Sequence, residues 1–185
     1  MQQIAKFGDF KDIHDALGIN TSDLGCVMLD FKTLVINPIP DSWLYTSDNP
    51  EHFWIKGWVG DYAHVTLLYG LLKPASEWEN YVLKLLGDWE PVACESTKII
   101  RFESPYHDEK YVCLAAELHV SDEILDAYRR LSFLPHIDTF TPYRPHVSLA
   151  YVKEEYADDA EEVLIEMGSD IIFIPTTLNL GSEKS

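Results

Sequence analysis

Apolar and polar positions alternate with different periods along the chain, and each period predicts a type of element. Residues 25–31 (GCVMLDF) and 62–69 are short, largely apolar runs, which is typical of strands. Between them, residues 37–60 are rich in Pro, Asp, Ser and Trp and indicate a long ordered loop, a kind of segment that is often functional. From Pro74 to Trp89 the apolar residues recur at helical spacing.

The second half of the chain shows a similar succession. Two strands are predicted at 98–102 and 111–119, with the segment SPYHDEK between them as a hairpin turn. Ser121 is expected to cap a helix with an apolar stripe from Ile124 to Leu131. The remaining expectations are a Pro-containing loop at 135–145, a strand at 146–152, an acidic amphipathic helix at 154–167, and final strands at 171–175 and 177–182.

One of the predicted strands occurs nearly twice. Residues 64–70 read HVTLLYG and residues 146–152 read HVSLAYV, with four of seven positions identical and Ser in place of Thr at a fifth. Each half therefore contains strands, this motif and a helix after it, and no linker separates the halves. The pattern predicts a single α+β domain over residues 1–185 with two pseudo-symmetric lobes.

The repeated motif brings together side chains that suit phosphodiester chemistry. Residues i and i+2 of a strand share a face, so His64 lies beside Thr66, and His146 lies beside Ser148. Imidazoles titrate near neutrality, so one can act as general base and the other as general acid. The two hydroxyls can donate hydrogen bonds to the phosphate oxygens on which charge develops. No metal is required.

The alternation of faces along a strand also separates other residues from these histidines and hydroxyls. Tyr69 and Tyr151 have the opposite parity and are expected in the core or on the back face. A third pair with the same spacing, His119 and Ser121, is interpreted as a structural coincidence because Ser121 serves as a helix cap. His52, His107 and His136 are expected to be surface or structural residues.

The paired motifs resemble those of the 2H phosphoesterase superfamily, which carries two H-x-[S/T]-x sequences. The resemblance implies a bilobal, LigT-like fold, with antiparallel sheets lining a central cleft and helices outside. It also implies that His64 and His146 are the acid–base pair and that Thr66 and Ser148 hold the phosphate. The superfamily includes bacterial RNA 2′,3′-cyclic phosphodiesterases and phage anti-CBASS nucleases, which degrade the cyclic oligonucleotide signals of bacterial defence.

Five further residues are candidates for substrate binding. Arg144 lies two residues before His146 and either binds a phosphate or is a surface residue. Tyr62 precedes His64 by two residues and either stacks on a base or packs. In the loop before the first motif, Trp54, Lys56 and Trp58 suit a nucleobase and a phosphate, or pack the two indoles.

Charge and cysteine content restrict the kinds of partner, metal site and cellular compartment that suit this protein. With 31 acidic and 14 basic residues the net charge is -17, which disfavours long nucleic acid because such binding neutralises phosphates with Lys and Arg. Three separated cysteines and the absence of His and Cys ligand motifs argue against disulfides and a metal site. No membrane-spanning stretch or signal sequence is expected, which predicts a cytoplasmic protein, in a bacterial or phage-infected cytosol. We also expect the protein to be a monomer without cofactors.

The substrate is expected to be a small nucleotide, and two kinds remain open. One is a cyclic oligonucleotide signal, which the acidity and the segment FWIKGW favour modestly; the other is a 2′,3′-cyclic phosphate of an RNA end or nucleotide. A hypothesis of another class is a protein that binds and sequesters a nucleotide without turnover. The presence of both His and both hydroxyls argues against this last hypothesis.

Overall fold

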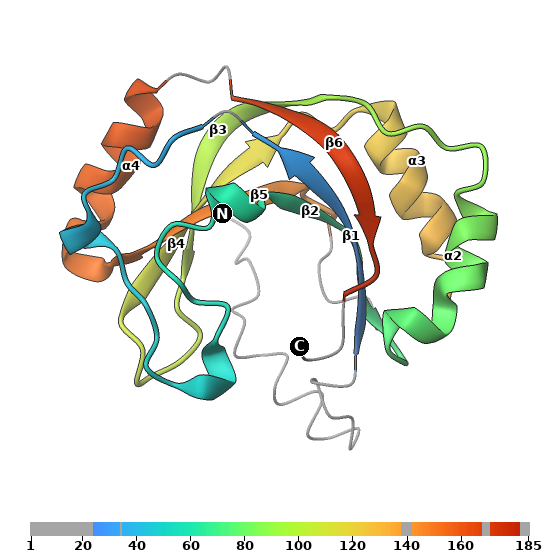
Figure 1. Cartoon of the computed structure of the whole chain (residues 1–185), viewed down its shortest axis with the longest axis horizontal. Helices are drawn as coiled ribbons and strands as arrows, with labels where there is room; N and C mark the ends of the chain where they lie inside the picture. Colours follow the sequence, from blue (N-terminus) through green and yellow to red (C-terminus); the bar gives the residue numbers. More distant parts are fainter. Residues whose placement is uncertain (1–23, 34, 138–141, 168–170, 182–185) are drawn as a thin grey trace.

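The computed structural model describes residues 24–33, 35–137, 142–167 and 171–181. Six strands in these residues form one antiparallel sheet in the order β2-β1-β6-β3-β4-β5 (Figure 1). Together with the helices beside it, this sheet confirms the mixed α+β class. The strands are β1 (Gly25–Lys32), β2 (His64–Leu71), β3 (Cys94–Glu103), β4 (Tyr111–Leu118), β5 (His146–Lys153) and β6 (Ile172–Asn179).

Three α-helices flank the strands, with α2 and α3 on one side and α4 on the other (Figure 1). The predicted cap of α3 is confirmed, because the Ser121 hydroxyl oxygen accepts a 3.2 Å hydrogen bond from the backbone N–H of Ile124. Within the described residues, the helices are too short and too polar to cross a membrane. The α-helices are α2 (Glu79–Leu85), α3 (Asp122–Leu131) and α4 (Ala157–Glu166), and the 3₁₀ segments are η2 (Asp41–Trp43), η3 (Pro50–His52), η4 (Gly60–Tyr62), η5 (Ala75–Trp78) and η6 (Glu154–Tyr156).

Several predicted elements differ from those observed. The strand expected to begin at Tyr62 begins at His64, and the helix expected at 154–167 is the 3₁₀ segment η6 followed by α4. The single helix expected from Pro74 to Trp89 is a 3₁₀ segment, η5, followed by the short helix α2. The two final strands expected at 171–175 and 177–182 are one strand, β6, that continues through Pro175. Proline lacks the N–H that a sheet ladder needs, and Pro175 lies where the pairing of β6 with β1 shifts register, so the irregularity accommodates it.

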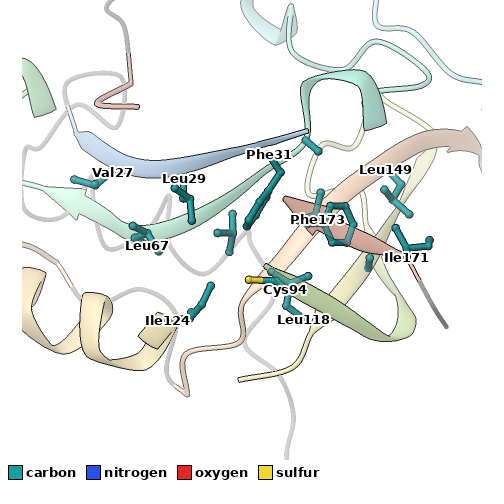
Figure 2. Packing of buried hydrophobic residues seen from close by; sticks show 14 of the residues in the cluster. Val27, Leu29, Phe31, Leu67, Cys94, Leu118, Ile124, Leu149, Ile171 and Phe173 are labelled. Atoms are coloured by element: carbon teal, nitrogen blue, oxygen red, sulfur yellow. The ribbon is translucent and has the colours of Figure 1, made fainter. Parts of the chain in front are cut away.

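One face of the sheet is buried against the helices. Alternate residues of the strands, among them Leu29, Leu67, Leu149 and Phe173, belong to the same buried cluster as Ile124 of α3 (Figure 2). Phe31 and Phe173 bring neighbouring strands together with ring centroids 5.6 Å apart. Burial of this apolar surface is the main source of stability, and it directs the remaining residues of each strand to the opposite face.

That opposite face, called the site face below, carries both motifs. Strand register places His64 opposite Asp30 of β1, and His146 opposite Glu117 of β4. The register of the pairings from β1 through β6, β3 and β4 to β5 shows that these residues lie on one face of the sheet. Although β2 and β5 stand at opposite ends of the strand order, they contact each other in space. The two motifs therefore meet.

Each motif strand contains an irregularity at the same place. In β2, Leu67 is the extra residue between the positions opposite Val27 and Met28, and in β5 Leu149 occupies the equivalent place. A bulge of this kind reverses which face the following residues occupy. The predicted back-face position of Tyr69 and Tyr151 is therefore wrong, since both are partly buried on the site face while their neighbours are fully buried. Tyr151 packs there against the buried cluster of Ile55, Tyr111 and Cys113, so the core position expected for it is partly confirmed.

Each half of the chain also pairs a loop with the outer edge of the other half's motif strand. The loop before the first motif pairs with β5, where the N–H of Tyr45 donates to the carbonyl of Tyr151 and that of Val59 donates to the carbonyl of Leu149. The loop before the second motif pairs with β2, where the N–H of Ile137 donates to the carbonyl of Gly70. The expected ordered loop at 37–60 is thus confirmed, and it covers an otherwise open sheet edge.

Candidate active site

The two histidines are held in the same way. The Nδ1 of His64 lies 3.1 Å from the backbone carbonyl oxygen of Tyr62, and the Nδ1 of His146 lies 2.9 Å from that of Arg144. A carbonyl oxygen only accepts, so each Nδ1 carries the proton and donates it. In the neutral ring Nε2 then holds the free lone pair, which fixes both imidazoles in the tautomer that offers Nε2 to a substrate.

The environments of the two rings differ. His146 is more enclosed and packs on the Phe102 ring, with centroids 4.8 Å apart. Burial lowers the pKa of His146, the hydrogen bond to the Arg144 carbonyl opposes this, and the positive charges of Arg144 and His64 lower the pKa further. The effect of His64 shows that the two imidazoles lie within electrostatic reach of each other. The lowered pKa means that His146 favours the neutral form.

A thiol lies behind each motif hydroxyl. The Cys26 Sγ donates to the Thr66 Oγ1 over 4.0 Å, and the Cys113 Sγ donates to the Ser148 Oγ over 3.6 Å. Both cysteines come from the strand paired with the motif strand, β1 in the first half and β4 in the second. Each half thus supplies an imidazole, a hydroxyl and a thiol in the same arrangement.

Arg144 stands beside His146 at one end of the site. Its Nε donates to the Glu117 carboxylate at 2.7 Å, and Lys98 pairs with the same carboxylate at 3.0 Å. Burial alone would raise the pKa of Glu117, but these hydrogen bonds outweigh it and hold that pKa below its ordinary value. Arg144 also borders a hollow of about 350 Å³, which Thr97, Glu117 and His119 line as well and which neither motif histidine lines.

The carboxylate opposite the other histidine has different partners. Asp30 faces His64 across the strands and accepts from the Asn179 amide nitrogen at 3.2 Å. Unlike Glu117, it is bonded to a neutral group. The two halves therefore share the strand pairing that places a carboxylate opposite the histidine, but they differ in the charges nearby. The cations Arg144 and Lys98 lie on the His146 side.

Tyr106, in the turn between β3 and β4, packs with Tyr151 around the buried cluster of Ile55, Tyr111 and Cys113. Its hydroxyl contributes to raising the pKa of Tyr69 and of Tyr151, in each case after the larger effect of burial. The His52 ring stacks on Tyr106 with centroids 3.9 Å apart, and His52 pairs with the buried carboxylate of Glu109. The Glu109 carboxylate also accepts from the Ser47 hydroxyl at 2.8 Å. These contacts anchor the 47–56 loop beside the site.

The predicted substrate-binding residues have different surroundings. Tyr62 does not pack, because 81% of its surface is exposed. Trp54 is 44% exposed at the anchored loop, and Lys56 lies 5.9 Å from the Phe53 ring centroid. Trp58 packs against the main core and its indole N–H donates to Asp61, which agrees with the packing interpretation for that residue.

Sequence reasoning missed the thiols, the two tyrosines and the carboxylate partners. Their signal is a second repeat on the strands that pair with the motifs, namely CVMLD at 26–30 and CLAAE at 113–117. Each has Cys at its first position and an acid at its fifth. Aligning the two halves on the H-x-[S/T] motifs alone does not reveal this repeat, because the distance between the paired strands differs in the two halves.

No group of three or more His, Cys, Asp or Glu side chains among the described residues is arranged to hold a metal ion. Paired imidazoles and hydroxyls are groups that can supply acid–base catalysis at a phosphate.

No protein-family model and no curated protein sequence matches the chain. Among solved structures, the chain is similar to Kluyveromyces marxianus Usb1 with uridine monophosphate, at a TM-score of 0.48 and 11% identity, over 87% of this chain and 99% of that one. A second structure of Kluyveromyces marxianus Usb1 gives a TM-score of 0.46 and 11% identity, over 86% and 98% of the chains. Similarity of this size assigns neither a family nor a function, which are inferred from the residues of the site.

Proposed function

We propose that the protein is a metal-independent phosphodiesterase of the 2H type that acts on small nucleotides. The observation that carries this proposal is the matched pair of imidazoles, each with Nδ1 bonded to the carbonyl two residues before it and each followed by a hydroxyl on the same face. A structural histidine needs neither a fixed tautomer with Nε2 available nor a counterpart within electrostatic reach. Both properties are requirements of paired acid–base catalysis.

In the proposed mechanism His146 is the general base and His64 the general acid. Burial beside Arg144 keeps His146 neutral, which is the form that accepts a proton. His146 takes the proton from a water or from a ribose 2′-hydroxyl, whose oxygen forms the new bond to phosphorus. The bond from phosphorus to the leaving oxygen breaks as His64, which begins the step protonated on both nitrogens, gives that oxygen the proton of its Nε2. Thr66 and Ser148 donate hydrogen bonds to the non-bridging oxygens.

Within this class, a cyclic oligonucleotide signal is the preferred substrate, as in phage anti-CBASS enzymes. The net charge of -17 opposes binding of long RNA, whereas a short substrate needs only the few cations beside His146. The exposed rings of Tyr62 and Trp54 are available to stack on bases. The second candidate is a terminal or mononucleotide 2′,3′-cyclic phosphate, which the same acid–base pair opens by adding water.

Product analysis by liquid chromatography, with EDTA present, tests the proposal. The panel contains 2′,3′-cyclic AMP, 3′,5′-linked cyclic di- and trinucleotides, and an RNA that ends in a 2′,3′-cyclic phosphate. Cleavage of the cyclic oligonucleotides supports the preferred substrate, and opening of only the 2′,3′-cyclic phosphates supports the second candidate. Binding without turnover of any compound would mean that the protein sequesters nucleotides, and the enzymatic proposal would be wrong.

Three histidine variants accompany this panel. His64→Ala and His146→Ala are each expected to lower kcat by about 10²-fold or more, the usual contribution of a positioned acid or base. His107→Ala is the matched control, because this histidine is exposed in the β3–β4 turn. Equal activity in all three variants would exclude the proposed pair.

A further inference from the structure

We propose that Cys26 and Cys113 are positioning residues, whose thiols orient the hydroxyls of Thr66 and Ser148 toward the substrate phosphate. This inference rests on the proposed phosphodiesterase function and extends it to a layer of residues behind the catalytic motifs. It is carried by the two S–H···O hydrogen bonds, at 4.0 and 3.6 Å, that recur in the two halves of the molecule.

Strand register shows that the two thiols occupy equivalent positions. Cys26 lies opposite Tyr69 and Cys113 lies opposite Tyr151, and in both motif strands the tyrosine follows the hydroxyl residue by three positions. The irregularities at Leu67 and Leu149 fall between hydroxyl and tyrosine in each case. Because the bulge keeps both side chains on the site face, the thiol comes diagonally beside the hydroxyl. Chance contact would not reproduce this arrangement twice.

The direction of the hydrogen bond matters for catalysis. A serine or threonine hydroxyl has one proton to donate and two lone pairs that accept. If its neighbour were a carbonyl or a carboxylate, the neighbour would take that proton. A thiol instead donates its own proton to the hydroxyl oxygen, so the hydroxyl proton is left for a non-bridging phosphate oxygen. A neutral thiol also adds no negative charge that would repel the phosphate.

The thiols are suited to remain donors. Burial raises the pKa of Cys26 to about 11 and that of Cys113 to about 11, with the hydroxyl contact opposing the shift in each case. Both side chains thus stay protonated at neutral pH and make poor nucleophiles. This environment fits a fixed hydrogen-bond donor rather than a reactive cysteine.

Cys94 provides a matched control within the same chain. It is also buried, and burial also raises its pKa to about 11, but its Sγ donates to the backbone carbonyl oxygen of Val92 at 3.4 Å. Cys94 belongs to the main core, on the face opposite the motifs. Substituting Cys94 therefore measures the cost of removing a buried thiol without disturbing a motif hydroxyl.

The test compares kcat and KM for Cys26→Ala, Cys113→Ala, Cys26→Ser, Cys113→Ser and Cys94→Ala on the nucleotide that the wild-type protein cleaves. Loss of one neutral hydrogen bond predicts a kcat about threefold to tenfold lower in Cys26→Ala and Cys113→Ala, with KM changed by less than about twofold. The serine variants keep a donor and are expected to regain most of the loss. Cys94→Ala is expected to retain the wild-type kcat.

A double variant separates positioning from general disturbance. If Cys26 acts through Thr66, adding Cys26→Ala to Thr66→Val lowers kcat no further. Wild-type kcat in both alanine variants, an equal loss in Cys94→Ala, or a full additional loss on the Thr66→Val background would each overturn the proposal.

Failure of the thiol proposal can be distinguished from failure of the phosphodiesterase proposal. If the wild-type protein cleaves nothing, the phosphodiesterase proposal fails, and the same variants are compared by calorimetric binding of adenosine 3′-monophosphate. Weaker binding in the two alanine variants, restored by serine, would then still support orientation of the hydroxyls. Equal binding in all variants, or no binding to the wild-type protein, would overturn the thiol proposal as well.

Discussion

The Tyr143 hydroxyl donates a 2.8 Å hydrogen bond to the backbone carbonyl oxygen of Thr66. Tyr143 belongs to the segment that leads into the second motif, whereas Thr66 belongs to the first motif. The bond therefore ties the segment before the second motif to the strand of the first motif. Tyr143 is itself fixed by stacking on Tyr128 of α3, with ring centroids 4.3 Å apart and planes 3° from parallel.

Removing this bond should loosen the site while preserving the packing around it. Tyr143→Phe keeps the stacked ring and deletes only the hydroxyl, and we expect it to lower the free energy of unfolding by about 1 kcal/mol. We expect kcat to fall by a larger factor than KM rises, because the displaced group is Thr66, the proposed phosphate-binding residue. Urea denaturation and steady-state kinetics measure the two effects, and unchanged values in both would show that the bond does not position the motif.

The pH dependence of activity should report His146. Its pKa lies below the ordinary value of 6.5, so the ring is neutral at pH 7 and becomes protonated, and inactive as a base, only as the pH falls through that lower value. In Arg144→Gln a neighbouring positive charge is lost and Glu117 keeps its negative charge, so the pKa of His146 should rise. The acidic limb of kcat/KM then moves to higher pH.

Proton NMR titration of the imidazole signals measures this shift directly. The His146 signal is identified by its absence from the spectrum of His146→Ala, and its titration midpoint is then followed. A midpoint that stays constant or falls in Arg144→Gln would contradict the electrostatic role given to Arg144.

The loop beside the site should depend on the pair formed by His52 and Glu109. Glu109 is 4% exposed, and without His52 its carboxylate would remain buried with the Ser47 hydroxyl as a partner. A buried charge that loses a partner is costly, so His52→Ala should lower the free energy of unfolding by about 1–3 kcal/mol. Urea denaturation checks this, with His107→Ala as the control from the neighbouring turn. Equal stability of the two variants would refute the anchoring role.

Gly70, the glycine of β2, should be difficult to replace. Its φ of +86° is unfavourable for other residues, and a Cβ atom there would lie 2.5 Å from the Ile137 carbonyl oxygen. Gly70→Ala should destabilise the protein by about 1–3 kcal/mol. Gly87→Ala is the control, because its nearest new contact is an ordinary 3.4 Å. A comparison of thermal unfolding midpoints distinguishes them, and a Gly70→Ala midpoint no lower than that of Gly87→Ala would be the contrary result.

Much of the architecture is predictable from the sequence because the informative signals are local. The motif strands, the ordered loop at 37–60 and the Ser121 cap follow from strand period, composition and capping chemistry. The face shared by His64 and Thr66 is also local, since it depends only on alternation within a strand.

The rest depends on pairings between distant residues. A bulge such as that at Leu67 leaves no mark in a period-two pattern, so the face of Tyr69 could not be predicted correctly. The partnership of Cys26 with Thr66 joins residues 40 positions apart, and it requires knowledge of strand register. Composition likewise gave no sign that His52 would pair with a buried glutamate.

The exchange of edge segments between the halves determines when the site can be completed during synthesis. The carbonyl and N–H of Tyr151 are bonded to the loop before the first motif, so that loop has its final partner only after β5 has left the ribosome. Residues 135–137, which pair with the outer edge of β2, leave the ribosome before β5, and until they emerge that edge stays open to other chains. Ribosome-bound chains that end before β5 should accordingly be cleaved by protease within the 44–59 loop, and chains that expose β5 should resist cleavage there.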